Sequence, residues 1–233
     1  MRRSKLYKAQ LATIEPQKRY DFAEAVAKLK AMGHVKFDET VELALKLGVD
    51  TRKSDQTVRG AVALPGGTGK LVRVAVIADG AAADEAKAAG ADFVGYTDMV
   101  DKIKGGWLDF DILIATPEAM KLVRPLGRQL GPKGLMPNPK TGTVTDQTAT
   151  AVKEAKAGRA EFRADRGACV HVPIGKLSFD ETALKANFDA VTDALLKAKP
   201  ASTKGNYFLS CTLSTTMSPG IKINLKELVR AKE

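Results

Sequence analysis

The sequence predicts an α/β protein of two domains, in which an α/β domain with a parallel sheet is inserted into a discontinuous α+β domain with an antiparallel sheet. Two observations predict this fold class. The middle third of the chain alternates short apolar strands with helices, whereas the flanking segments combine amphipathic helices with strands that are apolar at every second position. Glycine-rich stretches separate the two patterns, as is typical of domain boundaries.

The middle segment has the pattern of a doubly wound parallel sheet. Apolar strands are expected at 71–78, 92–96 and 110–115, and helices at 82–90, 97–106 and 147–157. Strands that are apolar throughout and alternate with helices are buried on both faces by those helices. We therefore expect three layers in this domain.

The outer segments have a different pattern. Val41, Leu43, Leu45, Leu47 and Val49 alternate strictly with other residues, which predicts a half-buried strand with one open face. Residues 57–65 are a candidate partner strand, and further strands are expected on both sides of a turn at 165–167 and at 206–216 and 220–225. Capping boxes at 21–24 and 178–181 predict the starts of two helices.

Glycines mark the two places where the chain passes between these patterns. We expect an outer domain of residues 1–67 plus 159–233 and an inserted domain of residues 68–158. Because glycine is free to adopt many backbone conformations, the crossings are also expected to form an interdomain hinge. The predicted hinge residues are Gly66, Gly67, Gly69 and Gly158.

The first crossing superficially resembles a phosphate-binding loop. The motif requires a glycine five residues before its Gly-Lys pair and a serine or threonine after it, but Leu64 and Leu71 stand at these positions. The loop also precedes a strand, whereas a phosphate loop opens a helix. These mismatches argue against the rival hypothesis, a nucleotide-dependent enzyme that uses the middle domain.

No residues form a catalytic or metal-binding pattern, so we expect neither an enzyme nor a cofactor. The only histidines, His34 and His171, have no neighbour at metal-ligand spacing, and the two cysteines, Cys169 and Cys211, are expected to be core thiols. The carboxylates are interpreted as helix caps or solvated groups, including the clusters Asp38/Glu39/Glu42 and Asp109/Asp111.

The charge of the chain favours a polyanionic partner. Residues 1–69 and 160–233 together have 24 lysines and arginines against 16 acidic residues, which is +8 of the formal net charge of +10. The longest apolar runs are too short to span a bilayer, and the N-terminus lacks the apolar region of a secretory signal. We therefore expect a cytoplasmic protein with no membrane partner.

Three stretches have unusual composition, and each has two open interpretations. Residues 125–145 contain four prolines and four glycines, and form either a basic finger or a surface crossover. Residues 36–56 have lysines and arginines on the polar side and include Phe37, which either stacks on a nucleotide or belongs to the core. Residues 213–220 form either a plain hairpin turn or a turn whose hydroxyl groups and Met217 contact RNA.

Several motifs together resemble one known family, bacterial large-ribosomal-subunit protein one. They are KFDETVE, LGVDTRKSDQTVRGAVALPGGTGK, GADFVG, LGRQLGPKGLMPNPKTGTV, KAGRAEFRAD and STTMSPG, which occur in order between about residues 20 and 223. The resemblance implies an outer domain that binds large-subunit ribosomal RNA and an inserted Rossmann-like domain without a dinucleotide.

The same resemblance implies the partners and the location. Family members form the mobile stalk beside the tRNA exit site of the large ribosomal subunit, contact the departing deacylated tRNA and assist its release. Many bacterial members also repress translation of their own operon mRNA. We accordingly expect a cytoplasmic ribosomal protein that is a monomer outside the ribosome.

Matched by position, the resemblance implies an RNA-contact surface in the outer domain's first strand and in the final turn, with residues 165–171 nearby. The basic residues of 36–56 add to it, so that the expected RNA-binding residues are Lys36, Phe37, Thr40, Lys46, Arg52, Lys53, Asp165, Arg166, His171, Ser210, Thr216, Met217 and Ser218. Ser218 departs from the family, which usually has glycine there. If the position requires a positive φ, serine costs about 1 kcal/mol more than glycine.

Overall fold

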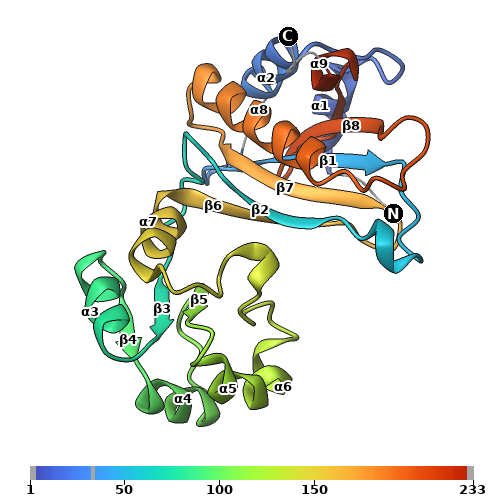
Figure 1. Ribbon diagram of the computed structural model, residues 1–233. Coiled ribbons are helices and arrows are strands. Elements are labelled where there is room, and N and C mark those ends of the chain that lie inside the picture. The colour runs from blue at the N-terminus through green and yellow to red at the C-terminus, as the bar shows by residue number, and fades with distance from the viewer. Residues whose placement is uncertain (1–3, 33–34, 230–233) are drawn as a thin grey trace. The chain divides into compact units, whose positions relative to one another are not determined.

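The computed structural model describes residues 4–32 and 35–229, which form helices and strands in two compact units (Figure 1). The outer unit comprises residues 1–69 and 160–233, and the inner unit comprises residues 70–159. The chain thus crosses between the units at 69/70 and 159/160, within two residues of the positions where the composition of the sequence changes.

The outer unit is built on a four-stranded antiparallel sheet with β1 at its centre. The strand order is β7 (Cys169–Lys176), β1 (Thr40–Leu47), β8 (Phe208–Thr215) and β9 (Ile221–Lys222). Along β1 every second side chain is buried, namely Val41, Leu43, Leu45 and Leu47. The alternation in the sequence therefore predicted correctly which face of this strand enters the core.

One predicted strand pairing is wrong. Residues 57–65 contain β2 (Arg59–Ala63), which pairs with β6 (Arg159–Arg163) in a separate two-stranded sheet and not with β1. The reason is that β1 already has a partner on each side: Leu43 lies opposite Val172 of β7 and Leu213 of β8. A strand forms hydrogen bonds along only two edges, so that no edge remains for β2.

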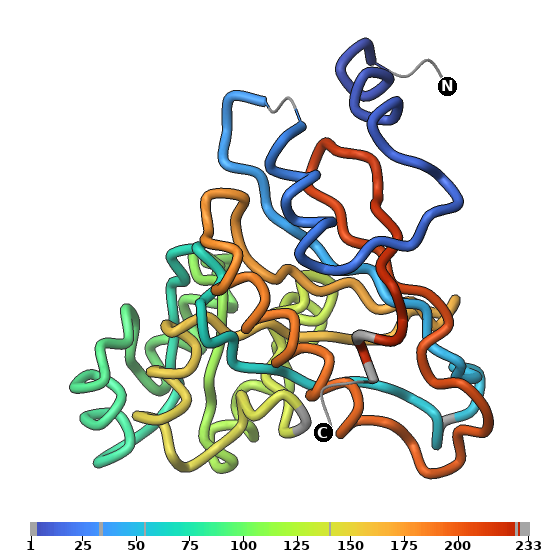
Figure 2. The backbone as a smooth tube through the Cα atoms, turned by 90° about the horizontal axis from the view of Figure 1, so that it is seen from above, coloured from blue at the N-terminus to red at the C-terminus, as the bar shows by residue number. Residues whose placement is uncertain are grey.

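Helices cover one face of the four-stranded sheet. α2 (Phe22–Ala31) and α8 (Glu181–Lys197) lie together on this side, where the Phe22 and Phe188 rings are 4.4 Å apart. The shorter helices are α1 (Lys5–Ala12), η1 (Ser54–Gln56) and α9 (Lys226–Val229). The blue N-terminal and red C-terminal segments run side by side (Figure 2), joined by a bridge between Tyr20 and Ile223.

The two predicted capping boxes mark helix starts but do not form the expected bonds. Asp21 precedes α2, yet its side chain makes no capping hydrogen bond. The N-cap of α8 is Asp180 and not Ser178. The Ser178 hydroxyl instead donates to a carboxylate oxygen of Asp38 at 2.8 Å, so that tertiary contact replaces the local cap.

The inner unit has the predicted doubly wound architecture. Its parallel sheet has the order β4 (Phe93–Gly95), β3 (Val74–Ile77) and β5 (Ile112–Ala115). All four residues of β3 are buried, with Ala75 and Ile77 in one core cluster and Val74 and Val76 in another. The helices that supply these cores include α3 (Ala81–Ala88), α4 (Thr97–Lys104), α5 (Met120–Val123) and α7 (Thr148–Gly158).

Residues 125–145 are folded onto the inner unit rather than extended as a finger. They contribute to η2 (Arg124–Leu126) and form α6 (Gly127–Leu130) and η3 (Pro139–Thr141), and Leu126 and Leu130 are buried. The buried hydroxyls of Thr141 and Thr143 lie 3.1 Å apart. Arg128 and Lys133 are exposed, so that this compact segment still presents positive charge to solvent.

The glycines of the first crossing are packed onto the outer unit. The buried Asn187 of α8 accepts a hydrogen bond from the Gly66 amide at 2.8 Å and donates one to the Gly67 carbonyl at 3.0 Å. A side chain at Gly69 would come within 2.7 Å of Lys176. These contacts restrain residues 66–69. The side chain of Lys70 is bonded to Asp111, and Leu71, at 97% exposure, is the first side chain after them that is surrounded by solvent.

A carboxylate anchors the start of the inner unit, contrary to the expectation that Asp111 is a solvated group. Asp111 accepts hydrogen bonds from the Lys70 ammonium at 2.7 Å and from the Arg73 backbone amide at 3.1 Å. The Lys70 bond, together with the Arg73 amide, lowers the pKa of Asp111 from 3.8 to about 2. The charged form of this carboxyl therefore stabilises the fold.

We predict that Asp111→Asn lowers the free energy of unfolding by about 1 kcal/mol at neutral pH, an amount reduced by the partial exposure of the pair. Because the folded-state pKa is lowered, this contribution is present above about pH 4 and is lost as the pH falls towards about 2. Urea unfolding of both proteins across this range measures the difference. Asp109→Asn is the control, since the Asp109 side chain is 75% exposed and its contact with Arg73 is long, at 4.0 Å. An equal effect of the two substitutions would contradict a stabilising role for Asp111.

Candidate nucleic-acid interface

The face of the four-stranded sheet opposite the helices forms a polar surface, which we call the open face. Residues directly opposite one another on paired strands share a face of the sheet. The pairing therefore places three rows on it: Pro173, Glu42 and Ser214; His171, Ala44, Thr212 and Lys222; and Cys169, Lys46 and Ser210. Most of these side chains are small, hydroxylic or basic, which suits contact with a sugar-phosphate backbone.

His171 lies on this open face and has a carboxylate partner that the sequence did not indicate. Its Nδ1 atom is 3.0 Å from Glu42 Oε1, and both side chains are largely exposed. His171 and Ser210, the two expected contact residues from β7 and β8, thus lie on the same face as Lys46. The sheet register, which joins residues far apart in the sequence, brings them together.

The end of the open face where β1 begins presents two exposed apolar side chains. Phe37 is 53% exposed and Met217 is 51% exposed, and neither belongs to a core cluster. The alternative in which Phe37 is a core residue is therefore wrong. Between them, the Thr40 amide donates to the Thr216 hydroxyl at 3.2 Å, which joins the start of β1 to the turn after β8.

A buried carboxylate holds this end together. Glu39 has no exposed surface, and its Oε2 atom accepts hydrogen bonds from the Thr215 hydroxyl at 2.6 Å and the Met217 backbone amide at 2.9 Å. The interpretation of Glu39 as a cap or a solvated group is therefore wrong. The alternation of β1 contained the signal, because position 39 has the same parity as the buried Val41 and Leu43.

Ser218 fits the turn without backbone strain, because the condition for a cost of serine is not met. Among the described non-glycine residues Ala168 alone has a positive φ, so Ser218 does not need the conformation that favours glycine. Its hydroxyl accepts a hydrogen bond from the Thr215 amide at 2.9 Å and donates to the Pro219 carbonyl at 3.2 Å. Serine at this position thus adds bonds within the turn.

We predict that Glu39→Gln lowers the free energy of unfolding by about 1–3 kcal/mol, because an amide oxygen is a weaker acceptor than a carboxylate oxygen and the new NH2 group must find its own acceptors inside the fold. Hydrogen exchange at the Met217 amide should accelerate at the same time. Glu42→Gln is the control on the same strand, where loss of the exposed contact with His171 changes stability by less than about 1 kcal/mol. Equal effects of the two substitutions would show that Glu39 does not organise the turn.

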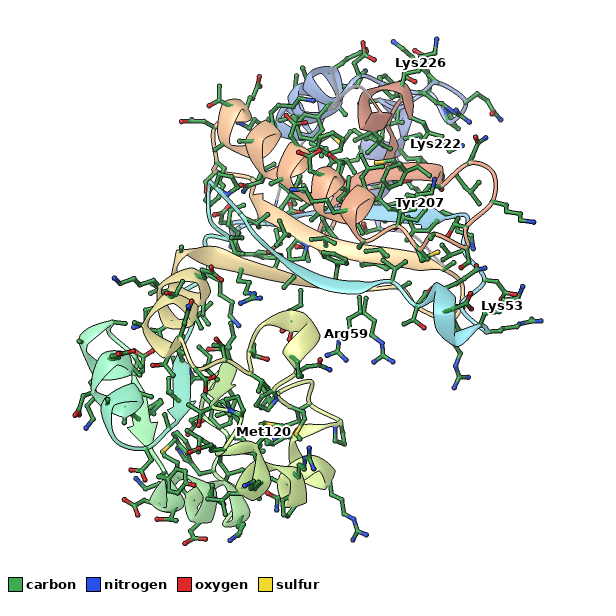
Figure 3. All side chains as sticks on the ribbon, in the orientation of Figure 1. Lys53, Arg59, Met120, Tyr207, Lys222 and Lys226 are labelled. Carbon is green, nitrogen blue, oxygen red and sulfur yellow. The ribbon has the colours of Figure 1, made fainter. Side chains whose placement is uncertain are left out.

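The opposite end of the open face is basic. A cleft of about 480 Å³ is lined there by Thr51, Thr57, Arg163, Ala164, Asp165 and Arg166. Arg52 and Lys53 are exposed next to it, and Lys53 extends from the segment before η1 (Figure 3). Within the described part of the chain, none of Arg52, Lys53, Arg163 and Arg166 forms an ion pair, so this group of cations is not neutralised.

Two of the expected contact residues at this end are bound within the protein. A carboxylate oxygen of Asp165 accepts a hydrogen bond from the Cys169 amide at 2.7 Å, and Lys46 donates to the Gly167 carbonyl. Both bonds stabilise the turn in which Ala168 has its positive φ of 57°. Asp165 thus has a positioning role that its sequence context did not reveal.

Most of the expected residues therefore form two groups at opposite ends of one strand. Lys46 is six positions after Thr40, which corresponds to about 20 Å along β1. Lys36, Phe37, Thr40, Thr216, Met217 and Ser218 lie at one end, and Arg52, Lys53, Asp165 and Arg166 at the other. His171 and Ser210 lie on the sheet together with Lys46. Any ligand that contacts all of them must be at least this long.

Two further kinds of feature are absent among the described residues. No group of three or more His, Cys, Asp or Glu side chains is arranged to hold a metal ion. No helix in this part of the chain is long and apolar enough to cross a membrane. His34 lies outside the described residues. The glycine-rich loop before β3 uses the Gly66 amide to bind Asn187, which removes this group from any phosphate site.

Comparison with known proteins decides the family. The model of the ribosomal protein L1p/L10e family matches residues 28–219. The chain belongs to this family. A relative from Methylobacillus flagellatus named large ribosomal subunit protein uL1 is 55% identical over 225 residues, which cover 97% of this chain and 98% of the relative. A relative of the same name from Teredinibacter turnerae is 57% identical over 228 residues, 97% of this chain and 99% of its own length.

Membership of the L1p/L10e family confirms two of the predictions. The resemblance inferred from the motifs is correct, and it extends over nearly the full chain. The L1p/L10e family consists of structural ribosomal proteins and not of enzymes, as the sequence analysis expected. The α/β fold with one antiparallel and one parallel sheet agrees with this assignment.

Proposed function

We propose that this member of the L1p/L10e family is a structural component of the large ribosomal subunit in the cytoplasm and that its outer unit binds large-subunit ribosomal RNA. The observation that supports this most strongly is the paired exposure of Phe37 and Met217 beside a turn held by the buried Glu39. Exposed apolar side chains on a rigid polar surface can stack on bases or contact riboses. The names of the relatives support the ribosomal assignment.

The two ends of the open face have different roles in this proposal. Phe37, Thr216 and Met217 recognise the shape of a folded RNA. Hydrogen bonds at the start of β1 fix the positions of Thr216 and Met217. Arg52, Lys53 and Arg166 neutralise phosphates, which contributes affinity but little sequence preference. Asp165 supports the second group by holding its turn.

The finer parts of the proposal follow from the L1 family resemblance. The RNA-bound outer unit anchors the protein in the mobile stalk at the tRNA exit site, where the inner unit assists release of deacylated tRNA. The same open face binds a leader site of its own operon mRNA and represses translation. The crossings at 69/70 and 159/160 support the proposal of interdomain motion, and the restrained glycines 66–69 favour a pivot at or beyond Lys70 at the first crossing.

Binding to a ribosomal-RNA stalk fragment and to a random duplex, each across a salt series, tests the main proposal. We expect the fragment to bind orders of magnitude more tightly, with a difference that persists as salt rises, because shape recognition does not depend on counterion release. Equal affinities that fall together with salt would reduce the open face to a non-specific basic surface. A leader-mRNA fragment in the same assay tests the repressor role.

We predict that Met217→Ala weakens binding of the stalk fragment by about 1–2 kcal/mol, as expected for an apolar side chain that the ligand buries. The slope of affinity against salt should not change, because no charge is removed. Filter binding measures both quantities. Leu71→Ala is the matched control, because it truncates an exposed apolar side chain of the inner unit; equal losses for the two variants would remove Met217 from the site.

A further inference from the structure

The open face does not end at β8. Thr212 of β8 pairs with Lys222 of β9, which places the Lys222 side chain on the same face as Thr212, Ala44 and His171. The other residue of this short strand, Ile221, is buried. Four strands about 4.8 Å apart give the face a width of about 14 Å from β7 to β9. Lys222 thus extends the open face beyond the residues inferred from sequence.

The N-terminal segment closes the edge of the sheet beside Lys222. The Tyr20 amide donates to the Lys222 carbonyl at 2.9 Å, and the Asn224 amide donates to the Tyr20 carbonyl at 2.9 Å. This pairing places Arg19, the residue before Tyr20, at the edge of β9. Lys222 lies beside β8 at this edge (Figure 3).

A groove of about 300 Å³ lies at this edge, and donor groups line it. Its polar lining residues are Arg19, Lys222, Gln17, Ser210 and Thr212. No carboxylate is among the residues that line it. Because Ser210 and Thr212 also belong to the open face, the groove is continuous with it. A ligand on the open face can therefore enter the groove without leaving the surface of the protein.

The two cations of the groove are not neutralised. Neither Arg19 nor Lys222 forms an ion pair with any described residue, whereas the neighbouring Lys18 is paired with Glu24 at 3.0 Å. The Lys222 ammonium donates to the Pro16 carbonyl at 3.0 Å, which leaves two of its three donors for a ligand. Two unpaired cations with hydroxyl and amide donors, and no carboxylate, match a phosphodiester group.

We propose that the groove lined by Arg19 and Lys222 binds backbone phosphates of the RNA that lies on the open face. The proposal rests on the proposed function, which supplies the RNA, and adds a contact site that the sequence motifs do not include. Charge complementarity favours an RNA phosphate as the occupant, because the groove offers hydrogen-bond donors and positive charge. An RNA strand that crosses β8 on the open face reaches the groove through Ser210 and Thr212. The interface then spans the full width of the sheet.

The test compares Arg19→Ala/Lys222→Ala with wild type for binding of the ribosomal-RNA stalk fragment across a salt series. Each lost phosphate contact is expected to reduce the slope of log affinity against log salt by about one, so that the double variant loses about two. Its affinity at low salt should fall about tenfold or more. Lys102→Ala/Lys121→Ala on α4 and α5 of the inner unit is the control, since it removes the same charge from exposed positions.

The outcomes separate this inference from the proposed function. If wild type prefers the fragment over a random duplex but the double variant matches the control, the groove does not bind RNA and the proposed function stands. If wild type shows no preference, the proposed function fails and this inference fails with it. Should the loss of the bond from Lys222 to Pro16 impair folding, the single variant Arg19→Ala decides, with an expected slope change of about one.

Discussion

The structure depends on the pairing of β1 with a strand on each side. β1 lies near the N-terminus, whereas its partners β7 and β8 follow the inserted inner unit. The outer unit can therefore form its core only when two distant segments of the chain meet. Leu43 and Leu45 then contribute to a single hydrophobic core with residues of α2 and α8. The insertion is tolerated because the chain leaves and returns outside this sheet.

The same pairing creates the surface that we assign to RNA. Because the helices cover only one face of the sheet, the alternate residues of β1, β7 and β8 remain exposed in a regular array. Strand pairing holds the array in place, and its small side chains allow a ligand to approach closely. Glu39 holds the turn after β8, since one buried oxygen accepts bonds from both Thr215 and Met217. Met217 is therefore exposed to solvent while its backbone amide stays bonded to Glu39.

The two units differ in how their sheets are covered and in where their charged groups lie. The parallel sheet of the inner unit is buried on both faces, and Asp111 is paired with Lys70 inside this unit. In the outer unit, cations at one end of the sheet and at its β9 edge form no ion pair with a described residue, namely Arg52, Lys53, Arg163, Arg166, Arg19 and Lys222. Such cations repel one another unless an anion is present, which is the electrostatic reason to expect a nucleic acid on this unit.

Sequence by itself determined the elements and the family. Alternation fixed the buried face of β1, because a strand has a period of two, and continuous apolar runs identified the parallel strands, because helices cover both of their faces. The motifs identified the family, and they predicted the RNA-binding residues that we propose for the open face. These signals are local in the chain, and each depends only on the order of side chains within one element.

Tertiary structure decided which elements pair and what individual polar groups do. The local sequence pattern could not show that β2 pairs with β6. Both edges of β1 pair with strands that lie more than a hundred residues later in the chain. Nor could composition show that Glu39 is buried while Glu42 is exposed, or that Asn187 forms hydrogen bonds with Gly66 and Gly67 at the first crossing. A carboxylate or amide acquires its role from the donors that the fold places around it, and those donors come from distant parts of the chain.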